Sequence, residues 1–174
     1  MSKGASGLFY GTLGAIPDFK FSDSVYKALA KALMHLSVQA WAKQKSSELT
    51  GKTKKNFNTA CVAFDQKTGK YYYGRNAGYR EEGYVRNPIL FGDSTHKGIL
   101  PKQSLNKYPV GNCAEVDAIN HALNAGAELK NLHITTIHTT KKRFGRYKES
   151  CENCTYAFRG KILENYSGWI NGGN

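Results

Sequence analysis

Four residues in the second half of the chain have types and spacing that could do chemistry. Glu115 follows Cys113 after one residue, and Cys151 and Cys154 form a Cys-x-x-Cys pair further along the chain. Three thiolates around Zn²⁺ leave a fourth position open for water, as catalytic zinc sites do. A carboxylate beside that position can take a proton from the water and return it to a leaving group. The four residues therefore predict a catalytic zinc centre.

The starts of two helices are expected to hold these side chains. The apolar 3–4 spacing after Cys113 predicts a helix over residues 113–125, and a second helix is predicted over 151–160. One β-branched strand, 132–140, lies between them, so both helix N-termini should meet at the same end of a sheet. Helix N-termini also favour the thiolate form of cysteine.

Further strands are predicted before and after these two helices. Apolar runs at 59–64 and 70–74 flank a short turn that contains Gly69, which predicts a β-hairpin. Residues 162–170 could supply a further strand. The long irregular stretch 75–109 is expected to form a wall of the pocket or a partner surface, because long loops in compact domains are usually functional or mobile.

The first third of the chain reads as a separate lead-in. Met1–Phe21 is Gly-rich and is expected to be loosely structured. Ser22 or Asp23 is a candidate N-cap for an amphipathic helix that ends near Lys45. The polar, Lys-rich stretch 46–56 is expected to be a connection.

Two domains are predicted from this division, a basic helical lead-in at 1–57 and a catalytic domain at 58–174. Of the 174 residues, 25 are Lys or Arg and 13 are Asp or Glu, which gives a net charge of +12 and a pI of about 9.6. Each part carries +6, so the lead-in holds half of the charge in a third of the length. Such an excess favours a polyanionic partner, nucleic acid first.

No transmembrane segment and no Sec signal peptide are expected. The longest apolar candidate, 25–41, is interrupted by two lysines, and the first twenty residues lack the apolar core of a signal peptide. The placement of the Cys-x-x-Cys pair favours metal chemistry in a reducing compartment over disulfides. Cys61, in the middle of a predicted strand, is expected to be a small buried hydrophobic residue.

The two cysteine motifs, Cys113-Ala114-Glu115 and Cys151-Glu152-Asn153-Cys154, resemble the signature of the zinc-dependent nucleobase and nucleoside deaminase superfamily. The resemblance covers residues 58–170. It implies a cytidine deaminase-like α-β-α fold of the α/β class, with an N-terminal hairpin, a mixed sheet and a zinc site at two helix N-termini. Within the superfamily, the Cys-Ala-Glu start, the basic chain and the helical lead-in are similar to the C-terminal deaminase domains of bacterial polymorphic toxins.

The resemblance also implies roles for individual residues. The implied zinc ligands are Cys113, Cys151 and Cys154. Glu115 would be the catalytic residue that protonates N3 of the base and then the departing ammonia. The backbone amide of Ala114 would bind the carbonyl edge of the base, and Asn76 resembles the asparagine that many members place at the pocket wall.

Two positions depart from the family pattern. Ser150 stands where most members have proline before the first cysteine of the pair. The ligand set is all cysteine, so Zn²⁺ and its three thiolates would sum to a charge of −1, which makes the zinc a weaker Lewis acid. We therefore expect a compensating cation, Arg146 or Arg159, to donate to a ligand sulfur.

The segment 141–148 is the strongest nucleic-acid signal in the sequence. It carries five basic residues and two aromatic ones and leads directly into Cys151. Basic side chains hold phosphates, and an aromatic ring can stack on an unpaired base. The expected substrate-binding residues of this segment are Lys141, Lys142, Arg143, Phe144, Arg146 and Tyr147.

Together these features predict a zinc-dependent enzyme that converts cytosine to uracil in nucleic acid, single-stranded DNA rather than RNA. As a toxin domain it would act in the cytoplasm of a target bacterium, mutate the genome there, and be covered by a cognate immunity protein. A free cytidine deaminase is the enzyme alternative, although the Asn-x-Glu of those enzymes is absent, because Ala77-Gly78 follows Asn76. A non-enzymatic, zinc-stabilised nucleic-acid binder is the other alternative, and adenine remains open as a target base.

Overall fold

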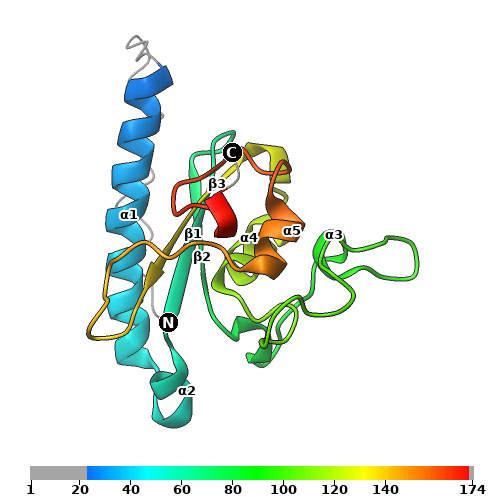
Figure 1. The fold of residues 1–174 in the computed structure, drawn as a ribbon, viewed down its shortest axis with the longest axis horizontal. Coiled ribbons are helices and arrows are strands. Elements are labelled where there is room, and N and C mark those ends of the chain that lie inside the picture. The colour runs from blue at the N-terminus through cyan, green and yellow to red at the C-terminus, as the bar shows by residue number, and fades with distance from the viewer. Residues whose placement is uncertain (1–22, 173–174) are drawn as a thin grey trace.

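Four strands form one mixed sheet in the computed structural model, which describes residues 23–172 (Figure 1). The strands are β1 (Thr59–Asp65), β2 (Lys70–Arg75), β3 (Leu132–His138) and β4 (Glu164–Asn165), in the spatial order β2-β1-β3-β4. β1 runs antiparallel to β2 and β3, whereas β4 runs parallel to β3. The predicted α/β class, hairpin and mixed sheet are confirmed at this level.

Five α-helices and three short 3₁₀ turns complete the described part of the chain. The α-helices are α1 (Asp23–Glu48), α2 (Gly51–Asn56), α3 (Pro88–Phe91), α4 (Ala114–Asn124) and α5 (Glu152–Phe158). The 3₁₀ turns are η2 (Gly78–Arg80), η3 (Leu129–Asn131) and η4 (Ile170–Gly172). Within residues 23–172, no helix combines the length and the apolar character needed to cross a bilayer.

The β1–β2 turn explains the register of the hairpin. Asp65 Oδ1 accepts a hydrogen bond from the Lys67 amide at 3.0 Å, and Oδ2 accepts one from the Thr68 hydroxyl at 2.7 Å. Gly69 has a φ of +72°, a conformation that glycine adopts without a steric penalty. Asp65 therefore pairs with Lys70, which fixes the alternation of every side chain along the two strands.

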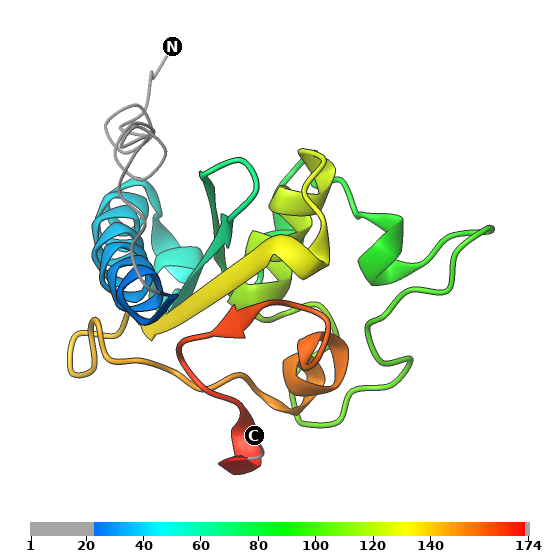
Figure 2. The same ribbon diagram turned by 90° about the horizontal axis from the view of Figure 1, so that it is seen from above.

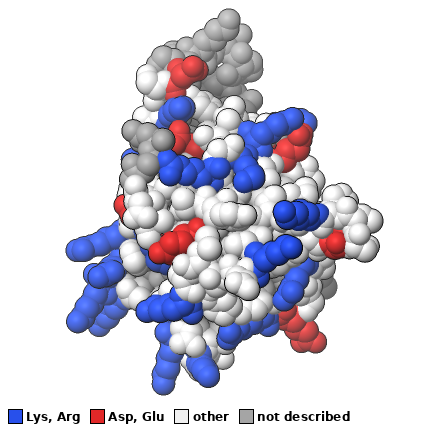
Figure 3. Space-filling model, turned by 45° about the vertical axis from the view of Figure 1, so that its right-hand side comes forward, with Lys and Arg blue, Asp and Glu red and all other residues white. Residues whose placement is uncertain are grey.

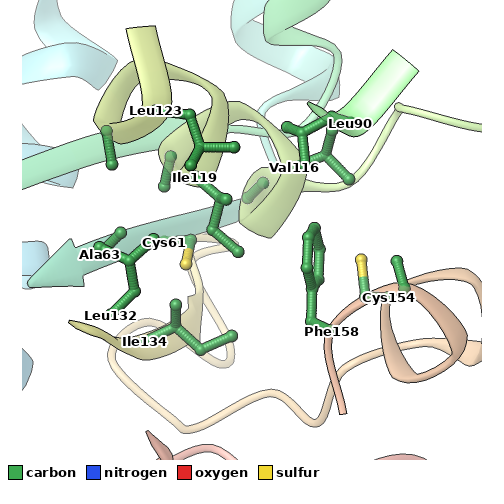
Figure 4. Close-up of a cluster of buried hydrophobic side chains, with 14 of the residues drawn as sticks. Cys61, Ala63, Leu90, Val116, Ile119, Leu123, Leu132, Ile134, Cys154 and Phe158 are labelled. Atoms are coloured by element: carbon green, nitrogen blue, oxygen red, sulfur yellow. The ribbon is translucent and has the colours of Figure 1, made fainter. Parts of the chain in front are cut away.

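Helices cover both faces of the sheet, as Figure 2 shows from above, with α1 on one side and α4 and α5 on the other. Successive side chains of β1 point to opposite faces. Ala60, Val62 and Phe64 join the cluster beneath α1, whereas Cys61 and Ala63 join the cluster beneath α4 and α5 (Figure 4). The result is a three-layer α-β-α arrangement.

The packing of α4 on β2 depends on Gly74. A Cβ at this position would overlap the backbone of α4 at Ala114 O and Ala118 N. Because glycine has no Cβ, the backbone of α4 can pack directly against β2 at this position. This contact sets the height above the sheet of the helix that begins beside Cys113.

The chain after β3 folds back along the same strand. The His138 amide donates to Arg146 O at 2.9 Å, Gly145 N donates to His138 O at 3.0 Å, and Lys148 N donates to Thr136 O at 2.9 Å. The basic segment 141–148 is therefore anchored to the end of β3 before it reaches α5.

Three element predictions need correction. The strand expected within 162–170 is only the two-residue β4, and β3 ends at His138 rather than Thr140. The polar connection 46–56 contains α2, and α1 continues to Glu48. The expectation for Met1–Phe21 lies outside the described residues.

Candidate metal centre

Three cysteine side chains meet at the starts of α4 and α5. Cys113 is the N-cap residue of α4, Cys151 is the N-cap residue of α5, and Cys154 lies in the first turn of α5. Their sulfur atoms all lie within 4.8 Å of one another. The spacing of the two motifs predicted this meeting of helix starts.

The geometry and the chemistry of this cluster fit a Zn²⁺ ion. Zn–S bonds of about 2.3 Å with tetrahedral angles place sulfurs about 3.8 Å apart, which agrees with the observed cluster. The Sγ atoms of Cys113 and Cys151 are 3.1 Å apart, and all four cysteines are free thiols. Cys61 is fully buried on β1 and apart from the cluster, as expected (Figure 4).

Electrostatics single out Cys151 as the thiol that ionises first in this group. Hydrogen bonds from the thiols of Cys113 and Cys154 hold the pKa of Cys151 well below its usual range, and the amides of Asn153 and Cys154 lower it further. These amides belong to the start of α5, where backbone N–H groups have no partner within the helix. The hydrogen bond to Cys151 raises the pKa of Cys113, and hydrogen bonds to Cys113 and Cys151 raise the pKa of Cys154.

Glu115 is a buried carboxylate in the first turn of α4. Its side chain belongs to a residue only 3% exposed, and its Oε1 accepts a hydrogen bond from Ser150 Oγ at 3.2 Å. Burial raises the pKa of Glu115, and the positive charge of Lys148 acts in the opposite direction. A carboxylate of this kind can hold and release a proton near the cysteine cluster.

Ser150 belongs to the site, although sequence reasoning treated it only as a departure from a family pattern. It is fully buried, and its hydroxyl accepts a hydrogen bond from Asn165 Nδ2 at 2.9 Å while it donates to Glu115. Its backbone bonds to Gly168 O and Ile170 N at 3.0 and 3.2 Å. The available signal was a polar residue at the position where the family has proline.

Ala114 and Asn76 lie at the end of the sheet where α4 begins. Ala114 is buried and is the first residue of α4, so its amide is one of the N-terminal donors that the helix leaves unpaired. The residue after Asn76 donates its amide to Asn112 O at 2.8 Å, next to Cys113. Both residues are therefore at the correct end of the sheet for their expected roles.

The side chain of Asn76 is already engaged with the backbone. Its Oδ1 accepts from the amides of Asn58 and Thr59 at 3.0 and 3.1 Å, and its Nδ2 donates to Asn56 O at 2.7 Å. Both acceptor positions of the amide oxygen are used in this way. One N–H remains for the expected contact with a base, and the main observed role of Asn76 is to tie the start of β1 to the end of β2.

The aromatic residues of the basic segment pack on α1. Phe144 lies in the cluster beneath α1, with Lys43 Nζ 5.7 Å from its ring centre. Tyr147 stacks on His35 with the ring centres 4.5 Å apart, and His35 Nε2 lies 2.6 Å from Gly145 O. If either ring stacked on a base, as expected, it would have to give up these contacts. The basic side chains of the segment, in contrast, are mostly exposed.

The expected sulfur donor is not Arg146 or Arg159. Among the hydrogen bonds of residues 23–172, neither guanidinium donates to a cysteine. Arg159 follows the last residue of α5, at the opposite end of that helix from Cys151. Lys148 is the cation that acts on the site, and its Nζ donates to Thr59 Oγ1 at 3.0 Å.

A separate cleft of about 940 Å³ lies between the loop that follows α3 and the outer side of α5. Its walls include Phe91, Leu100, Leu105 and Tyr156, and none of its lining residues is a cysteine of the cluster or Glu115. The volume of this cleft therefore gives no argument about the chemistry at the cysteines.

Comparison of the chain with protein-family models, with curated proteins and with solved structures finds no match. The residues at the cysteine cluster are therefore the basis on which a function is proposed.

Proposed function

We propose that this protein is a zinc-dependent deaminase that acts on cytosine in nucleic acid. The observation that carries the proposal is the position of Glu115, a buried carboxylate in the first turn of α4 and two residues from Cys113. A purely structural zinc site needs no carboxylate beside it, whereas hydrolysis requires a group that moves protons.

Cys113, Cys151 and Cys154 would hold the zinc ion, and the fourth coordination position would remain open. When bound, the ion would supply a Lewis acid that makes water acidic enough to react near neutral pH. The overall reaction consumes one water for each cytosine and releases uracil and ammonia.

The residues of the chain have separate tasks in this reaction. Glu115 would carry one proton from the attacking water to N3 of the base, and a second proton from the new hydroxyl group on C4 to the amino group, which leaves as ammonia. Ser150 would keep the carboxylate of Glu115 in one orientation through the 3.2 Å hydrogen bond. The amide of Ala114, at the start of α4, would receive the carbonyl oxygen of the base.

The arrangement of elements supports the same proposal. Apart from the four-residue helix α3, a hairpin, a helix, a strand, a second helix and a final short strand follow one another from residue 59, which is the order that the resemblance implies. Both helices that carry cysteines begin at the same end of the sheet. We include a cytidine deaminase-like fold in the proposal on this ground.

Nucleic acid is the proposed substrate because the protein carries many exposed basic residues and because Glu115 is buried. Exposed lysines and arginines surround the end of the sheet where the cysteines lie, and Glu115 is buried. A base can reach such a carboxylate only outside a stacked duplex, so a single strand is the simplest substrate. We further propose an interbacterial toxin that acts on DNA in the target cytoplasm, with an immunity protein as its partner.

The test compares the zinc-loaded protein with its Glu115→Gln variant on single-stranded DNA, duplex DNA, RNA and free cytidine, scored for uracil. Glu149→Gln is the matched control, because Glu149 is an exposed carboxylate next to Ser150. We expect uracil in single-stranded DNA with the parent and with the control, and at least a thousandfold less with Glu115→Gln.

Each other outcome has a definite meaning. Reaction with free cytidine alone would replace the nucleic-acid proposal with a free cytidine deaminase. Inosine from adenine-containing strands would change the target base. No reaction with any substrate, together with tight binding to DNA, would leave a zinc-stabilised binding module.

A further inference from the structure

The helix α2 contributes nothing to the hydrophobic core. Its six residues, Gly51–Asn56, include three lysines and no buried residue. The N-cap residue Thr50 makes no side-chain hydrogen bond to the helix, so the start of α2 lacks a common stabilising contact. Neighbouring lysines on one short helix repel one another. Both features destabilise α2, and no burial in the core offsets them. We therefore expect α2 to bind a partner outside the chain.

Hydrogen bonds place α2 beside the basic segment that leads to Cys151. The Thr139 amide donates to Asn58 O at 3.1 Å, and the Thr139 hydroxyl donates to Phe57 O at 2.9 Å. Lys148 Nζ reaches Thr59 Oγ1 at 3.0 Å. Two segments that lie more than eighty residues apart in the sequence therefore form one surface.

This surface, which we call the α2–loop surface, is rich in positive charge, and the acidic residues nearest to it along the chain are Glu48 and Glu149, at its borders. Its exposed cations are Lys52, Lys54, Lys55, Lys141, Lys142, Arg143 and Arg146. Residues 49–64 and 139–148 contain no Asp or Glu, and none of the seven cations joins an ion pair within residues 23–172. Figure 3 shows Lys and Arg side chains gathered over the lower part of the molecule, at the height where Figure 1 places α2.

The α2–loop surface lies at the same end of the sheet as the start of α4. Thr59 pairs with His138 at the end of the sheet from which α2 and the basic segment project. The side chain of Asn76 joins this end to α2 through Asn56 O at 2.7 Å, and the next amide bonds to Asn112 O beside Cys113. A strand bound on this surface would therefore lie at the end of the sheet where the cysteine-bearing helix α4 begins.

We propose that the α2–loop surface binds the phosphate backbone of an unpaired nucleic-acid strand whose base enters the site. The proposal rests on the proposed function and adds the helix α2 to the elements that bind the substrate. Lysine and arginine bind phosphates by releasing condensed counterions, which makes affinity fall with salt. An unpaired strand fits because the carboxylate of Glu115 is buried and a paired base could not reach it.

The test measures binding of a fluorescent oligothymidine to the zinc-loaded protein as a function of salt. The first variant replaces Lys52, Lys54 and Lys55 by alanine. The control replaces Lys67, Lys70 and Lys130, which lie at the opposite end of the sheet beside Asp65 and Leu132. Both variants lose three positive charges, so a general effect of net charge would be equal in the two.

For the α2 variant we expect weaker binding and a slope of log K against log salt that is smaller by about 2, since each lost phosphate contact on a single strand contributes about 0.7. The control should keep the parent slope. Equal losses in both variants, an unchanged slope in the α2 variant, or tighter binding of duplex than of single strands would overturn the proposal. Oligothymidine has no cytosine, so this result is read independently of the uracil assay.

Discussion

The hydroxyl of Ser150 donates a hydrogen bond to Glu115 Oε1 at 3.2 Å, between two residues that are both buried. Ser150 directly precedes the N-cap residue of α5, and Glu115 lies in the first turn of α4. Asn165 of β4 donates to the same hydroxyl at 2.9 Å. One side chain therefore connects the carboxylate to both cysteine-bearing helices and to the sheet.

Replacing Ser150 by alanine should lower turnover without releasing zinc. The hydrogen bond to a charged group contributes on the order of 1.5 kcal/mol, and its loss leaves the carboxylate free to rotate, so we expect kcat to fall about tenfold. Ser150→Thr keeps a hydroxyl and should recover most of the activity. The measurements are kcat, KM and zinc content, and zinc loss in proportion to kcat would show that Ser150 supports the ligands instead.

Removal of zinc should expose the cysteine cluster to oxidation. The Sγ atoms of Cys113 and Cys151 lie 3.1 Å apart, which is close enough for a disulfide to form after small movements. We expect a chelator to lower the thermal stability and air to produce a Cys113–Cys151 disulfide, detected by peptide mass spectrometry. Cys61→Ala is the control and should keep one zinc per chain, whereas Cys154→Ala should lose it.

Stability should fall as the pH drops below about 6.5 because of His133. Burial lowers the pKa of His133 from 6.5, against an opposing effect of Glu164. The unfolded chain therefore binds the proton more readily than the folded one, so this stability is present above pH 6.5 and is lost as the pH falls. Urea unfolding should show a flatter pH dependence for His133→Gln than for the parent.

The control for His133 is His96→Gln, because His96 lies on an exposed loop. This variant should keep the pH dependence of the parent. A parent-like pH dependence in His133→Gln would contradict the assignment.

Phe144 should act on stability more than on binding. Its ring lies in the cluster beneath α1, so Phe144→Ala should lower the free energy of unfolding by about 2 kcal/mol. Tyr108→Ala is the comparison, because Tyr108 is 49% exposed and should cost little stability. Chemical unfolding and oligothymidine binding would be measured for both, and a Phe144→Ala variant of full stability that no longer binds would restore the stacking role.

The cysteines and Glu115 could be predicted from the sequence because their positions follow from local rules. Each cysteine motif stands at a helix start, and helix starts can be recognised from apolar spacing. The hairpin could be predicted for the same reason, since Asp65 and Gly69 mark its turn. In both cases a few neighbouring residues carry the whole signal.

The partners of Glu115 could not be predicted because they depend on long-range pairing. Asn165 reaches Ser150 only through the two-residue strand β4, which has no periodic signal of its own. Arg146 and Arg159 were expected near the cysteines from sequence distance, yet the fold-back along β3 and the length of α5 carry them elsewhere. The helix α2 was missed because it has no apolar stripe.

The absence of a side chain at Gly74 has a consequence for how the site tolerates sequence change. Even a single methyl group there would collide with Ala114 and Ala118 and push α4 away from the sheet, and α5 would not move with it. The cysteine at one helix start would then separate from the two at the other, without any change in a ligand. The affinity of the cysteine cluster for a metal ion would therefore depend on a residue almost forty positions before Cys113, where a substitution would resemble an ordinary core defect.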